Sequence, residues 1–143
     1  MPVTALWYGN GLKSLASGLV DFANDDIYVM LLDNTHTPDQ DAHDFINDVS
    51  GDEVVGTGYT AGGALMSTPS LTYTGATNIL KFDGGDVSWA ASTITARFAV
   101  VYKNTGTPAT SPLLLYINAG ADVSTTNGLF QVTWHADGIA KIT

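Results

Sequence analysis

The sequence predicts a mainly β protein, a single antiparallel β-sandwich domain over residues 1–143 with a short N-terminal helix. Beyond residue 50, short apolar or alternating runs are separated by turn-forming residues, and many short strands at such spacing are typical of sandwiches and barrels. The length fits one domain, and neither a repeat nor a low-complexity block divides the sequence. Sheet topology stays open between a jelly roll and an immunoglobulin-like sandwich.

The N-terminal segment carries the pattern of an amphipathic helix. Apolar residues recur at helical spacing, at Leu12, Leu15, Ala16, Leu19 and Val20. Gly11 and Gly18 each weaken a helix by about 1 kcal/mol, so we expect a short helix over about 11–20. The polar residues 24–26 then end it, and the apolar run 27–33 predicts a buried strand.

The rest of the chain predicts a succession of short strands. They are expected at 53–57, 62–67, 70–74, 78–83, 94–103, 113–119, 129–135 and 138–142. The run 94–103 is apolar on both faces, which indicates a central strand covered on both sides. Residues 135–140 predict a tight hairpin built on Asp137 and Gly138, and the last strand should tie down the C-terminus.

Alternation also predicts which side chains of the late strand 129–135 enter the core. Phe130, Val132 and Trp134 share one face, whereas Gln131 and Thr133 share the other. We therefore expect Trp134 in the core rather than at the surface.

Charge and composition exclude several classes of partner. The chain has 14 acidic and 5 basic residues, a net charge of -9, so we expect neither nucleic-acid nor membrane binding. It has no cysteine, hence no disulfide framework or thiolate metal site, which fits assembly in a reducing compartment. The N-terminus lacks the pattern of a signal peptide, and no segment reaches 18 apolar residues.

The acidic stretch that begins at residue 37 raises the question of a metal site. Asp39, Asp41 and His43 or Asp44 imitate the start of an EF-hand loop, but Asp44 and Ser50 stand where that loop needs Gly and Glu. A looser Ca²⁺ site from Asp39, Asp41, Asp48 and Asp52 stays open. The alternative is a solvated loop whose aspartates cap a helical turn at about 40–47, and we expect this one, with no metal or cofactor. His36, His43 and His135 lack the spacing of a zinc site.

The sequence lacks the complete motifs that predict nucleotide binding or catalysis. Residues 56–61 read G-x-G-x-x-A, but further glycines follow where the motif needs a helix, so we expect them to serve a strand bend or close strand packing. No G-x-S-x-G elbow is present. Trp7, Trp89 and Trp134 would make a sugar platform only if exposed. We expect no enzyme and no catalytic residues.

Five long motifs carry a resemblance to a known family. They are DDIYVMLLD, TPDQDAHDFINDVS, EVVGTGYTAGG, LKFDGGDVSWAASTITARFAVVYKNTGT and PLLLYINAGADVSTTNGLFQVTW. In these motifs the chain resembles a family of small virion proteins of tailed double-stranded DNA bacteriophages. The resemblance covers nearly the whole chain and implies a structural role, with capsid decoration as the favoured function and a tail or fibre module that binds a host-surface glycan as the alternative.

The resemblance also implies partners and a location. We expect the chain to assemble in the host cytoplasm, bind the major capsid protein of the same phage on the capsid exterior, and form a homo-oligomer, with a trimer as the natural guess. Two contact surfaces are expected, one formed by Trp7 and Tyr8 and one formed by the acidic loop with Asp39, Asp41, His43, Asp44 and Phe45. The alternative for Trp7 and Tyr8 is that they close one end of the sandwich.

Overall fold

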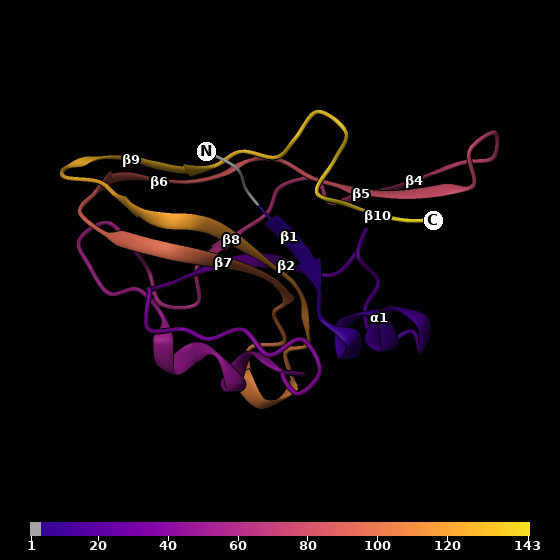
Figure 1. The fold of residues 1–143 in the computed structure, drawn as a ribbon, viewed down its shortest axis with the longest axis horizontal. Helices are drawn as coiled ribbons and strands as arrows, with labels where there is room; N and C mark the ends of the chain where they lie inside the picture. The colour runs from indigo at the N-terminus through magenta and orange to yellow at the C-terminus, as the bar shows by residue number, and fades with distance from the viewer. Residues whose placement is uncertain (1–3) are drawn as a thin grey trace.

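The structure is a computed structural model that describes residues 4–143 (Figure 1). It is mainly β, with 45% strand, 12% helical residues, ten strands in antiparallel sheets and one α-helix in the described part of the chain. The predicted fold class, a mainly β single domain consistent with a β-sandwich, is therefore confirmed.

The strands and helices follow one another closely along the chain, and the longest connection, between β2 and β3, contains two 3-10 helices. In order they are β1 (Thr4–Trp7), α1 (Gly9–Ala16), β2 (Ile27–Leu32), the 3-10 helices η1 (Ile46–Asp48) and η2 (Ser50–Asp52), β3 (Ala64–Leu65), β4 (Ser70–Thr74), β5 (Ile79–Asp83), β6 (Val87–Ser92), β7 (Thr95–Lys103), the 3-10 helix η3 (Pro108–Thr110), β8 (Leu113–Ser124), β9 (Gly128–Val132) and β10 (Ala140–Ile142).

Two layers of sheet form the sandwich. The larger sheet has five strands in the order β1-β8-β7-β2-β3, and the other layer consists of a three-stranded sheet, β10-β5-β4, and a two-stranded ribbon, β6-β9. Figure 1 shows the ribbon and the three-stranded sheet lying end to end above the larger sheet, with α1 and the 3-10 helices below. Because β6 follows β5 after three residues, one continuous piece of chain spans both halves of the upper layer.

The larger sheet is buried on both faces. Its upper face contributes Val29, Leu31 and Val101 to a core shared with the upper layer, which adds Trp89 and Phe130. Fully burying one such aliphatic side chain stabilises the fold by about 1.5–3 kcal/mol.

The lower face of the same sheet forms a second core. Met30, Leu32 and Val100 pack there with Ile46 and Val49, which come from the long segment between β2 and β3. Strand β7 places alternate residues in the two cores, so the prediction of a central strand with both faces covered is confirmed.

The helix is shifted from its predicted place. We expected about 11–20, but α1 ends at Ala16 because Gly18 takes a positive φ of 79° just past the C-cap. The N–H of Gly18 donates to the carbonyl of Leu15, and the N–H of Leu19 donates to that of Ser14, which is a Schellman motif. Gly18 therefore ends the helix instead of weakening its interior.

Most predicted strands are present, and the differences have local causes. The runs 27–33, 70–74, 78–83 and 94–103 form β2, β4, β5 and β7, while 62–67 shortens to β3. The run 129–135 becomes β9, and 138–142 becomes β10, which pairs with β5 and ties down the C-terminus as predicted. Strand β8 runs on to Ser124, through residues predicted as a turn, because its end pairs with the start of β7.

One predicted strand was wrong, two strands were missed, and the predicted hairpin at 135–140 is limited to a single bridged turn. Residues 53–57 make only isolated bridges, Leu32 with Glu53 and Thr57 with Thr93, instead of a strand. Strands β1 and β6 were missed, although the buried Val87 and Trp89 alternate with exposed residues in β6. The turn at Asp137 and Gly138 does form, but β9 pairs with β6 and β10 with β5, so no hairpin joins β9 and β10.

Candidate functional site

The acidic loop, defined here as residues 33–53, forms a third layer of the fold and is not a loop surrounded by solvent. It leaves the end of β2 and covers the lower face of the larger sheet (Figure 1). Ile46 and Val49 are 3% and 0% exposed and enter the lower core. The loop holds seven carboxylates and no lysine or arginine, so it combines an apolar underside with an acidic outer surface.

The two ends of the acidic loop are tied together. The Nδ1 atom of His36 lies 2.8 Å from Oδ2 of Asp52, and the N–H of Asp33 donates to the carbonyl oxygen of Asp52 at 3.0 Å. The His36 ring is buried and packs edge-on against Phe98, with ring centroids 5.3 Å apart. This histidine therefore works as an anchor, a role that its spacing in the sequence did not reveal.

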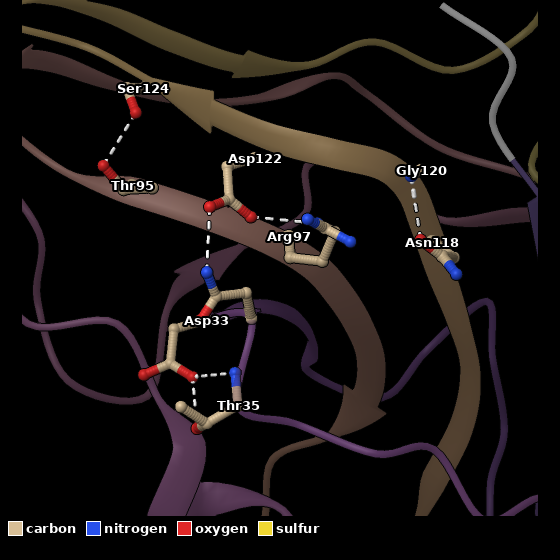
Figure 2. Close-up of polar contacts among 9 residues, drawn as sticks. Asp33, Thr35, Thr95, Arg97, Asn118, Gly120, Asp122 and Ser124 are labelled. Atoms are coloured by element: carbon tan, nitrogen blue, oxygen red, sulfur yellow. Dashed lines mark hydrogen bonds and ion pairs between the residues drawn. The ribbon is translucent and has the colours of Figure 1, made fainter.

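A polar network attaches the start of the loop to the larger sheet (Figure 2). Asp122 on β8 accepts a hydrogen bond from Nδ2 of Asn34 at 2.9 Å and one from Nε of Arg97 at 2.9 Å. Asp33 in turn accepts the N–H of Thr35 at 2.8 Å and closes the turn that carries Asn34. Strands β7 and β8 thus fix where the acidic loop begins.

The aspartates of the loop cap its turns, as predicted. Oδ1 of Asp39 accepts the N–H groups of Asp41 at 3.1 Å and of Ala42 at 3.0 Å. Oδ2 of Asp48 accepts the N–H of Asp44 at 2.9 Å. Such bonds satisfy backbone donors that the irregular chain leaves unpaired. The helical structure itself is smaller than expected over 40–47, a turn at 40–42 and η1 at Ile46–Asp48.

Asp44 and Asp48 have opposite electrostatic environments. Burial raises the pKa of the Asp44 carboxyl, and the neighbouring Asp48 raises it further. The backbone N–H of Asp44 holds the pKa of Asp48 below its usual range. The pair therefore keeps one carboxylate firmly charged and makes the second one costly to ionise.

The structure brings the two predicted contact surfaces together. Nε2 of Gln40 donates to the carbonyl of Trp7 at 2.6 Å, and the N–H of Gly9 donates to the carbonyl of Gln40 at 3.0 Å. The Tyr8 ring lies 6.1 Å from that of His43. The N-terminal segment and the acidic loop are therefore one surface, which sequence spacing alone could not show.

Trp7 and Tyr8 pack in the two cores on opposite faces of the larger sheet. Trp7 is half-buried and packs edge-on against Phe82, with centroids 4.9 Å apart. Tyr8 is 0% exposed, and its ring packs on Tyr116. Its hydroxyl has no hydrogen-bond partner among the described residues, and burial raises the pKa of this hydroxyl. The expectation that Tyr8 contacts a partner is corrected, because its side chain does not reach the surface. Both side chains thus belong to the packed interior, and whether they close one end of the sandwich stays a prediction.

The remaining candidate contact residues differ in how far their side chains are exposed to solvent. Asp39 and Asp41 are exposed, whereas His43, Asp44 and Phe45 are partly buried. Phe45 forms an isolated bridge with Pro112, and the backbone carbonyl of Asp44 accepts the N–H of Leu113. Asp39 and Asp41 are thus the residues best placed to meet a partner.

The carboxylates considered for a looser Ca²⁺ site are engaged in separate places. Asp48 serves backbone N–H groups within the loop, and Asp52 pairs with His36. Over residues 4–143, no group of three or more His, Asp or Glu side chains is placed to hold a metal ion.

The glycine-rich segment 56–63 is structural, as its sequence predicted. Oε1 of Glu53 accepts the Tyr59 hydroxyl at 2.9 Å and the N–H of Gly62 at 2.6 Å, and the Tyr102 hydroxyl donates to the Gly62 carbonyl at 2.6 Å. Gly63 has a φ of 82°, and a Cβ there would collide with the backbone of Val29. The segment leads into strand β3, so no helix stands where a nucleotide loop needs one.

A cavity that the sequence did not reveal lies between the larger sheet and strand β9 with the segment that follows it. Its volume is about 730 Å³, and its walls include Ala96, Ala99, Ile117, Val132 and Trp134. Alanines at inward positions of β7 leave this space open. The face predicted from alternation is confirmed, because Phe130, Val132 and Trp134 all pack on the upper core.

No family model, no curated protein and no solved structure matches this chain. Within the part of the chain that the structure describes, no helix is long and apolar enough to cross a membrane.

Proposed function

We propose that this chain is a structural protein of a tailed double-stranded DNA phage virion, a decoration or cement protein that binds the assembled capsid from outside. The resemblance of its long motifs to small virion proteins supports this function. One of those motifs, TPDQDAHDFINDVS, forms most of the acidic loop, so the family-like sequence coincides with the best-defined outer surface of the fold.

The observation that carries the proposal is an acidic surface held in place by packing and hydrogen bonds. Ten of the 14 acidic residues lie between residues 21 and 53, where no lysine or arginine occurs. The loop that carries most of them is held by the lower core, by the His36–Asp52 pair and by Asn34. A fixed shape binds without the cost of ordering a mobile loop, which suits docking on a rigid shell.

In this proposal the loop meets basic groups of the major capsid protein through Asp39 and Asp41. A negative surface is disfavoured on the inner wall, next to packaged DNA, and suits the capsid exterior. An exposed ion pair contributes only about 0.2–1 kcal/mol, but many copies bind one particle. A protein that binds only the assembled shell stabilises it by mass action.

The alternative, a tail or fibre module that binds a glycan, has less support. It predicts an exposed aromatic platform, but Trp89 is buried, and Trp7 and Trp134 are half-buried against the core.

The test uses particles assembled without this chain. Purified protein is added back, and bound copies are measured against free concentration at two salt concentrations. We expect saturable binding that weakens with salt, and we expect the double variant Asp39→Asn, Asp41→Asn to bind roughly 2- to 30-fold more weakly. Asparagine retains the oxygen that accepts the loop N–H groups, so the fold should be kept.

Asp137→Asn is the matched control, because the Asp137 side chain is 70% exposed and lies outside the acidic loop. It should bind like the unmodified chain. Equal binding by the Asp39 and Asp41 double variant would refute the acidic loop as the contact. The absence of binding to any shell would refute the decoration function itself.

A further inference from the structure

Charge is absent from a long continuous part of this chain. Residues 54–80 contain no aspartate, glutamate, lysine or arginine, although the chain carries a net charge of -9. Four of the eight large apolar side chains exposed on the described surface lie in this stretch, at Val55, Leu65, Leu71 and Tyr73. Acidic residues and exposed apolar residues are therefore segregated along the chain.

The hairpin of β4 and β5, residues 70–83, is the part of this surface that projects most. Figure 1 shows it reaching beyond the larger sheet as a thin arm. We call it the β4–β5 arm. All five residues of β4 are exposed, and among the strands of residues 4–143 it pairs with β5 alone, which makes it an edge strand. An exposed edge with apolar side chains is a template for pairing with another chain.

One face of the arm is continuous with the core. Leu71 pairs with Phe82 and Tyr73 pairs with Leu80, so these four side chains share a face of the sheet. Phe82 is 2% exposed and packs against Trp7 and Phe22, whereas Leu71 and Tyr73 are 41% and 63% exposed. The apolar face thus begins inside the molecule and runs out along β4 into solvent.

We propose that the β4–β5 arm is the surface through which this chain binds a second copy of itself. Two copies with a charge of -9 repel each other wherever their acidic surfaces meet. The arm avoids that repulsion, because it has two charged residues, Lys81 and Asp83, whose opposite charges cancel. The Nζ atom of Lys81 lies 3.6 Å from Oδ2 of Asp83. A strongly basic partner would gain nothing from an uncharged arm and would bind the acidic loop instead.

Self-association through the arm goes beyond the proposed capsid binding, and each is tested by its own measurement, so one can fail while the other holds.

The molar mass of the full chain in solution tests the proposal. One chain has a mass of 15.0 kDa, and light scattering or sedimentation at micromolar concentrations should give a multiple of it. The double variant Leu71→Thr, Tyr73→Thr keeps residues suited to a strand but removes the apolar anchors. We expect its dissociation constant to rise by at least about 30-fold, which shifts it towards 15.0 kDa.

Leu129→Thr is the matched control, since Leu129 is 58% exposed on β9 and lies outside the uncharged stretch. It should associate like the unmodified chain. A second variant, Tyr73→Lys, should also dissociate the assembly, and far-ultraviolet circular dichroism checks that each variant is folded.

An unmodified chain that stays at 15.0 kDa would overturn the proposal, as would a folded double variant that keeps the larger mass. A monomeric chain whose binding to capsids depends on Leu71 and Tyr73 would also overturn it and assign the arm to the shell.

Discussion

The substitution Val49→Ala tests whether the acidic loop is a packed layer of the fold. Val49 is 0% exposed and lies in the lower core with Ile46. Alanine removes two methyl groups, whose loss from the core costs roughly 1.6 kcal/mol at about 0.8 kcal/mol each. A residual cavity of a few tens of Å³ adds about 1 kcal/mol. We therefore expect the free energy of unfolding to fall by about 2–3 kcal/mol.

Urea denaturation followed by circular dichroism measures this change. The midpoint should fall while the slope stays constant, which shows that stability changed rather than the extent of unfolding. The matched control is Val55→Ala, which deletes the same atoms six residues later at a side chain that is 94% exposed. It should change stability by less than about 0.5 kcal/mol. If Val49→Ala lowers the free energy of unfolding as little as the control does, the acidic loop is not a packed layer of the fold.

Two further predictions test the glycine-rich segment and the paired carboxylates. Gly63→Ala should destabilise the fold by about 3 kcal/mol or more, because residue 63 has a positive φ and a Cβ there would collide with the β2 backbone. The control Gly51→Ala, with open space around it, should be nearly neutral. Similar denaturation midpoints for the two variants would contradict this prediction. Asp44→Asn should stabilise the protein by about 0.5 kcal/mol at pH 7. Since the pKa of Asp44 is raised in the fold, its ionisation is less favourable there than in the unfolded chain. The advantage of asparagine should therefore be absent below about pH 4, the ordinary pKa of an aspartate, grow as the pH rises, and be complete above the raised pKa. Denaturation at pH 3 and pH 7 measures it, and an equal gain at both would count against the role of Asp48.

The sequence predicted the strands whose pattern is local. Residues 94–103 alternate between two apolar faces, and the structure buries both faces of β7. The helix boundary failed because Gly18 has two meanings, an interior defect or a C-cap, and only the backbone conformation separates them. The prediction of which strands pair was wrong for a different reason. The turn at Asp137 and Gly138 is local, but whether its flanking strands pair depends on β5 and β6, which are distant in sequence.

The candidate surface was predicted only in part. Capping by Asp39 and Asp48 follows from short-range hydrogen bonds and was expected. The position of Tyr8 was not decided, since an aromatic side chain suits a core and an interface equally well. The anchoring of the loop through His36 and Asn34 joins residues that only the folded chain brings together.

The composition of purified virions tests the proposed function most directly. If the chain decorates the capsid, quantitative mass spectrometry should find it on the order of hundreds of copies per particle, in fixed proportion to the major capsid protein. A protein of the tail or fibre would be present at roughly a dozen copies or fewer. Such a low count, or the absence of the chain from the particle, would contradict the decoration function.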